Sequence, residues 1–105
     1  MSDPVLGSFE EQVMLAVLRT DDEAYGMSVR REIEATTGRD VAIGAVYATL
    51  DRLEAKGLLT SSRTSGSGVR RIFEVTTGGA EALLETRELR DRLWAGVQLS
   101  RLPAE

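Results

Sequence analysis

Residues 43–75 read IGAVYATLDRLEAKGLLTSSRTSGSGVRRIFEV, and this stretch decides the fold. From Ile43 to Lys56 the apolar residues recur at the i, i+3, i+4, i+7 spacing of one helix face, and a glycine ends the pattern. Residues 58–63 and 70–75 then have strand character, with a polar Ser/Gly-rich loop between them. The stretch therefore predicts a helix followed by a β-hairpin with a long loop.

Two further helices precede this unit. Ser8 and Glu11 have the spacing of a capping box, which predicts a first helix ending near Arg19. That helix is apolar on nearly all sides, so it needs cover on more than one face, and a second subunit is a candidate for part of it. A second helix is expected from Tyr25-Gly26 to about Thr37.

The chain after the hairpin predicts one long helix. Thr76 is its expected cap, and it runs from Thr77 to about Leu102, roughly 39 Å at 1.5 Å per residue. The preceding residues would form a body with a radius of gyration of only about 11 Å, so the helix must project beyond it. Its apolar side chains would then be exposed on a monomer, which predicts a homodimer. The expected interface residues are Leu89, Leu93 and Val97.

The fold class expected is mainly α with a small β-hairpin (α+β), namely a winged helix-turn-helix with a long C-terminal dimerisation helix. The expected division is an N-terminal tail at 1–8, a winged helix-turn-helix at 9–76, the dimerisation helix at 77–102 and a tail at 103–105.

Composition limits the chemistry. The 105 residues include no cysteine and no histidine, which excludes disulfides, thiolate zinc sites and the commonest general base. We therefore expect no enzyme, and nominate no catalytic residue, metal ligand or cofactor. The chain starts without a signal peptide and has no bilayer-spanning apolar run, so a cytoplasmic protein without membrane contact is expected.

The distribution of charge along the chain bears on what the protein binds. The net charge is −4, yet residues 42–73 carry five cations against two carboxylates. In a winged helix-turn-helix the third helix enters the DNA major groove. The residues expected on its outward side are Ala45, Ala48, Thr49, Arg52 and Lys56. Small side chains there permit close approach to bases, Thr49 can contact a thymine methyl group, and the two cations can neutralise phosphates. Arg63, Arg70 and Arg71 flank the hairpin loop, where they can follow the DNA backbone. The same residues also suit a solvated helix and a charged sheet edge, which is the plainer interpretation.

The sequence resembles the PadR family of bacterial transcriptional regulators in three stretches, at residues 25–27, 44–58 and 70–79. The resemblance implies regulators that bind double-stranded DNA and dimerise through their C-terminal helix, here of the compact single-helix type. It also implies that Tyr47 packs its ring inward and directs its hydroxyl to a DNA phosphate. In some drug-responsive members a tryptophan on the last helix stacks planar ligands, which makes Trp94 a candidate for binding a planar aromatic small molecule. Ordinary interface packing of Trp94 is the alternative.

These observations favour a dimeric repressor that binds an inverted repeat and is released by a small aromatic ligand. The second hypothesis is a winged-helix protein-interaction module that uses the same dimer without binding DNA.

Overall fold

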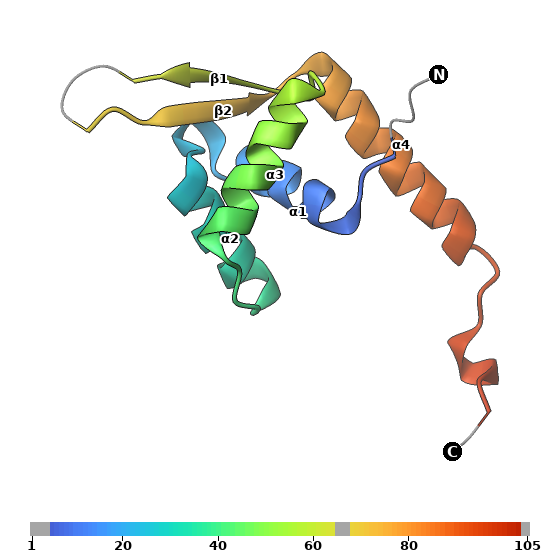
Figure 1. Cartoon of the computed structure of the whole chain (residues 1–105). Coiled ribbons are helices and arrows are strands. Elements are labelled where there is room, and N and C mark those ends of the chain that lie inside the picture. Colours follow the sequence, from blue (N-terminus) through green and yellow to red (C-terminus); the bar gives the residue numbers. More distant parts are fainter. Residues whose placement is uncertain (1–4, 65–67, 104–105) are drawn as a thin grey trace.

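The computed structural model describes residues 5–64 and 68–103 and contains the expected series of three helices, a hairpin and a last helix (Figure 1). The elements are α1 (Ser8–Arg19), η1 (Asp21–Glu23), α2 (Gly26–Thr37), α3 (Ile43–Ala55), β1 (Leu59–Arg63), β2 (Arg71–Val75), α4 (Thr77–Trp94) and η2 (Leu99–Arg101). None of the helices in these two ranges combines the length and apolar composition needed to cross a membrane. The α+β class and the winged-helix order expected from the sequence are confirmed.

Two helix ends follow the local sequence signals, and one departs from them. Gly38 ends α2 in the left-handed conformation, with φ of 73°. The Thr76 hydroxyl caps α4 by accepting a hydrogen bond from the Gly79 amide at 3.0 Å. The capping box expected from Ser8 is wrong by one residue, because Ser8 is already helical. The backbone amide of Gly7 instead donates to Glu10 Oε1 at 2.9 Å.

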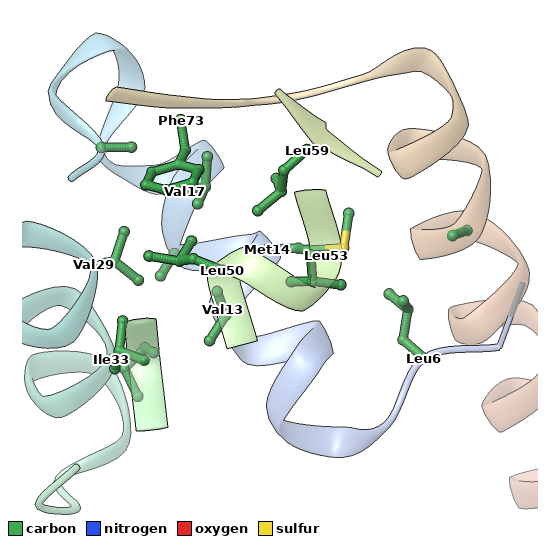
Figure 2. Close-up of a cluster of buried hydrophobic side chains, with 14 residues drawn as sticks. Leu6, Val13, Met14, Val17, Val29, Ile33, Leu50, Leu53, Leu59 and Phe73 are labelled. Atoms are coloured by element: carbon green, nitrogen blue, oxygen red, sulfur yellow. The ribbon is translucent and has the colours of Figure 1, made fainter. Parts of the chain in front are cut away.

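The core lies where α1, α2, α3 and the hairpin meet (Figure 2). Val13 and Met14 of α1 have no exposed surface, and neither has Leu50 of α3. Phe73 of β2 points into the same cluster, and its backbone amide donates to Ala24 O at 2.8 Å. The hairpin is therefore anchored both to the core and to the segment that precedes α2.

The hairpin forms the wing, by which we mean β1, β2 and the loop that joins them. Its strands are antiparallel, with Leu59 opposite Val75 and Arg63 opposite Arg71. Each strand is slightly shorter than the sequence predicted. Of the loop expected at 64–68, residues 65–67 lie outside the part of the chain that the structure describes.

The last helix is shorter than expected. It ends at Trp94 rather than near Leu102, because Ala95 leaves the helical conformation and Gly96 follows with φ of 80°. A glycine in this left-handed conformation is a common helix stop. A short 3₁₀ turn, η2, follows. Even so, α4 extends away from the other helices, and the molecule measures 59 × 35 × 20 Å (Figure 1).

Two contacts attach α4 to the N-terminal part of the chain. The Leu6 amide donates to the buried Thr86 hydroxyl at 3.0 Å, and Arg90 forms an ion pair with Glu11 at 2.6 Å. These contacts fix the direction of α4 relative to α1. Beyond Arg90, every described side chain of α4 is exposed in the single chain.

Candidate nucleic-acid interface

The exposed side of α3 carries small side chains. Ala45 and Ala48 are exposed, as the sequence predicts. On the opposite side, Val46, Leu50 and Leu53 are completely buried and hold the helix to the core. At Ala45 and Ala48 the small side chains would let a ligand approach the helix backbone closely.

Thr49 does not belong to this exposed surface. It is only 3% exposed, which corrects its expected position on the outward side of α3. The reason is helical geometry, since Thr49 follows Val46 by three residues and precedes Leu53 by four. Its hydroxyl accepts a hydrogen bond from Arg52 Nη2 at 3.2 Å. Thr49 therefore positions Arg52 and is not placed to contact a base.

The two cations near the end of α3 share one carboxylate of α1. Glu10 accepts from Lys56 Nζ at 2.8 Å and from Arg52 Nε at 3.3 Å. These donors, Lys56 first, hold the pKa of the Glu10 carboxyl below its usual value. About half of each cationic side chain remains exposed, so each can also meet an external anion. Sequence reasoning missed Glu10, because nothing local connects it to residues more than forty positions away.

Tyr47 packs against the first turn of α2. A Cβ atom placed on Gly26 would lie 2.2 Å from Tyr47 Cε1 and 2.7 Å from its hydroxyl oxygen. The tyrosine ring therefore occupies the space that a side chain at Gly26 would need. Nearly half of Tyr47 is nevertheless exposed. The ring thus packs against α2, whereas the contact of its hydroxyl with a DNA phosphate stays a prediction.

Arg71 is engaged within the protein. It donates to Asp51 Oδ1 at 2.7 Å, to Glu54, and to the Ser61 hydroxyl at 3.2 Å. These bonds raise the pKa of Arg71, the bond to Asp51 most strongly. The pKa of Glu54 is lowered, first by donation from Ser61 and then by Arg71. The structure thus gives Arg71 the role of joining the wing to α3, where the sequence had predicted a DNA contact.

The other two wing arginines face outward. Arg63 is exposed and has no ion pair among the side chains that the structure describes. The Arg70 guanidinium lies over the Tyr25 ring, 4.2 Å from its centre. Arg31 of α2 approaches the same ring at 5.9 Å and donates to its hydroxyl at 3.0 Å. The sequence analysis did not single out Arg31 and missed this grouping.

The residues expected at a dimer interface lie together along the end of α4. Leu93 is 68% exposed, Val97 beyond the helix is half exposed, and Leu89 is partly buried. Leu89 and Leu93 line a groove of about 530 Å³ between α4 and α1, and Leu15 of α1 lines it from the other side. Trp94, the last residue of α4, is largely exposed in the single chain.

Comparison with known proteins agrees with this architecture. The family described as "Transcriptional regulator PadR-like family" matches residues 14–85. The transcriptional regulator Rv3488 of Mycobacterium tuberculosis is 38% identical over 74 residues, which are 70% of this chain and 68% of that protein. The structure of RosR from H. salinarum superposes with a TM-score of 0.69 at 26% identity, covering 89% of this chain and 81% of the other. A PadR family transcriptional regulator from Eggerthella lenta gives 0.65 at 27% identity, covering 82% and 80%. The chain belongs to the PadR-like family of transcriptional regulators.

Proposed function

We propose that this transcriptional regulator is a dimeric, sequence-specific DNA-binding repressor. The observation that carries the proposal is the exposed strip of small side chains on α3, with cations at one end and the wing beside it. In a winged helix-turn-helix this is the helix that enters the major groove. We assign Ala45 and Ala48 to the bases, because only small side chains let the backbone come close to base edges.

The remaining contacts are assigned to phosphates. Tyr47 is nearly half exposed and its hydroxyl is assigned to a phosphate, while Arg52 and Lys56 keep about half of their side chains accessible at the end of α3. Arg63 and Arg70 reach outward from the wing. Such contacts fix the position of the protein on DNA without reading its sequence.

The dimer is proposed from the apolar surface that one chain leaves uncovered. Leu93 is exposed on α4 beside the groove next to α1, and a second copy related by a two-fold axis would cover both. Two recognition helices in such a dimer would bind an inverted repeat with half-sites about one helical turn apart, or a multiple of it. A dimer bound there would exclude other proteins from the DNA that it covers, which is the proposed basis of repression.

The dimer is tested by Leu93→Asp, with Leu102→Asp as the matched control because both leucines are exposed to the same degree. Burying an unpaired carboxylate would dissociate the dimer, while the control should remain dimeric. Sedimentation velocity measures both. A wild-type monomer at micromolar concentration would refute this part of the proposal.

The effector role is proposed for Trp94, the single tryptophan of the chain. Its exposed ring beside Leu93 would face its counterpart across a two-fold interface and stack on a planar aromatic molecule. A planar cationic dye should then quench tryptophan fluorescence and release DNA in the same concentration range. Quenching without release would leave a binding site that does not regulate.

DNA binding itself is tested with labelled duplexes over a salt series. The proposal expects binding to a mixed-sequence duplex that weakens linearly in log–log form as salt increases, and tighter binding to a duplex selected from a random pool. Absence of binding at low salt would favour the second hypothesis, a protein-interaction module. The net charge of −4 also favours that hypothesis.

A further inference from the structure

Tyr25 is the point where two arginines from distant parts of the chain meet. Arg70, the residue before β2, stacks over the ring at 4.2 Å, and Arg31 in α2 lies 5.9 Å from the ring centre. Arg31 also donates from Nη2 to the Tyr25 hydroxyl at 3.0 Å. One partly buried aromatic ring thus orders two exposed guanidinium groups.

These two arginines differ from most other cations of the described chain, which have carboxylate partners. The paired cations are Arg19, Arg30, Arg52, Lys56, Arg71 and Arg90. Among the side chains that the structure describes, neither Arg31 nor Arg70 forms an ion pair. The acidic turn η1 is next to Tyr25 in the sequence, yet neither Asp21 nor Glu23 pairs with either arginine.

Local hydrogen bonds fix the backbone that carries the ring and the backbone of Arg70. The Tyr25 amide donates to the Ser28 hydroxyl at 2.9 Å, and that hydroxyl donates to Glu23 O at 2.6 Å. On the wing side, the Arg70 amide donates to the Thr64 hydroxyl at 2.9 Å. Stacking uses the flat face of a guanidinium and leaves the N–H donors at its edges for an anion. An arginine ordered in advance also loses less conformational entropy when it binds a phosphate.

The location of this group points to its ligand. Tyr25 directly precedes Gly26, against which the Tyr47 ring of the recognition helix packs. The same segment receives the hydrogen bond from Phe73 of the wing. In Figure 1 the chain leading into α2 passes beneath β2, close to α3. Arg70 of the wing and Arg31 of α2 therefore meet on Tyr25, next to the glycine against which the helix assigned to the major groove packs.

We infer that Arg31 of α2 and Arg70 of the wing, both held on Tyr25, form a clamp for DNA phosphates. This inference rests on the proposed DNA-binding function and adds Arg31 and Tyr25 to the interface. Arg31 and Arg70 supply the charged donors, whereas Tyr25 acts as a positioning residue. Phosphate contacts do not depend on base sequence, so a mixed-sequence duplex is a sufficient probe.

The test measures binding of a fluorescein-labelled mixed-sequence duplex by anisotropy across a salt series, with the full chain. Arg31→Gln and Arg70→Gln each remove one positive charge. Arg101→Gln is the matched control, because Arg101 is exposed and has no ion pair in the described part of the chain. Arg101 lies in η2, beyond the end of α4 (Figure 1). Losing one phosphate contact should reduce the log–log salt slope by about 0.9, which corresponds to about eightfold weaker binding at roughly 0.1 M salt. The control should keep the wild-type affinity and slope.

Two further variants test the stacking on the Tyr25 ring separately from the charge of the arginines. Tyr25→Phe keeps the ring that Arg70 stacks on but removes the hydroxyl that accepts a hydrogen bond from Arg31, so it should weaken binding less than Tyr25→Leu does. Tyr25→Leu removes the ring without changing charge, and it should weaken binding roughly threefold or more while circular dichroism shows a wild-type fold. Equal binding by folded Tyr25→Leu and wild type would overturn the clamp.

The remaining outcomes separate this inference from the function on which it rests. A wild-type protein that binds DNA while Arg31→Gln behaves like Arg101→Gln overturns the clamp and leaves the proposed function standing. A wild-type protein that binds no duplex at low salt overturns both. Loss of slope in Arg31→Gln and Arg70→Gln, with the control unchanged, supports the clamp.

Discussion

Gly79 is the position where a single methyl group should do most damage to the junction between the wing and α4. A Cβ atom there would lie 2.2 Å from the carbonyl oxygen of Leu58 and 2.9 Å from the side chains of Met14 and Val75. The Leu58 carbonyl is backbone and accepts a hydrogen bond from the Thr76 amide at 3.1 Å. The Gly79→Ala variant must therefore displace α4 or break the contact that starts it.

The neighbouring glycine provides the control. A Cβ atom on Gly78 meets nothing closer than 3.8 Å, so Gly78→Ala should gain about 0.5–1 kcal/mol from helix propensity. Overpacking at Gly79 costs about 1–3 kcal/mol, and loss of the Leu58–Thr76 bond adds about 1 kcal/mol. After the same propensity gain, the two variants should differ by about 2–4 kcal/mol. For a domain of this size the difference corresponds to about 10–25 °C in Tm.

Thermal unfolding followed by circular dichroism at fixed protein concentration measures the difference, because association makes Tm depend on concentration. We expect Gly78→Ala to melt at or above the wild-type temperature and Gly79→Ala well below it. If the two variants melt within a few degrees of each other, the close packing at the start of α4 does not limit stability, and the reasoning fails.

Two further predictions concern the DNA interface and pH. Gly26→Ala should displace the Tyr47 ring and weaken DNA binding roughly tenfold, as Tyr47→Phe should, because both would remove the hydrogen bond that we propose between the Tyr47 hydroxyl and a phosphate; unchanged anisotropy titrations would contradict the assignment of that hydroxyl. The lowered pKa of Glu10, caused mainly by Lys56, means that its stabilising effect is complete above the unfolded-state pKa of about 4.3 and is lost as pH falls through the lower folded-state value. Between about pH 6 and pH 3, urea midpoints of Glu10→Gln should therefore fall less steeply than those of the wild type.

Local patterns were sufficient to predict most of the fold. The periodic apolar residues of α3 and the glycine after α2 lie within one or two helical turns of what they determine, so sequence alone could place them. The same holds for Thr76, whose capping hydrogen bond reaches only three residues along the chain. The error at the end of α4 has a local cause too. Gly96 is a signal for the end of a helix, but the leucines that follow it continue the apolar pattern. The predicted helix therefore extended past this glycine, whereas α4 in fact ends at Trp94.

The interface was harder to predict because its chemistry depends on pairs that are distant in sequence. Counting cations predicted that Arg71 would be available for DNA, but Asp51 and Glu54 of α3 occupy it. The burial of Thr49 depends on how α3 packs, which a single helical wheel resolves only to within one position. Arg31 lies only six residues from Tyr25, yet its grouping with Arg70 needs the tertiary fold that brings the wing over α2.

These pairings bear on how an acidic chain would bind DNA. Ion pairs with Glu10 reduce the charge that Arg52 and Lys56 offer, and Arg71 is committed to the wing. In the described part of the chain, the charge left near the proposed interface would then come mainly from arginines without a carboxylate partner, namely Arg31 and Arg70 at Tyr25 and Arg63 on the wing. Because each neutralised phosphate contributes about 0.9 to the salt slope, the slope per subunit should follow those arginines and not the five cations of residues 42–73. Modest non-specific affinity would leave more of the binding to the contacts between α3 and the bases, and this is the condition under which a regulator discriminates its operator from other DNA.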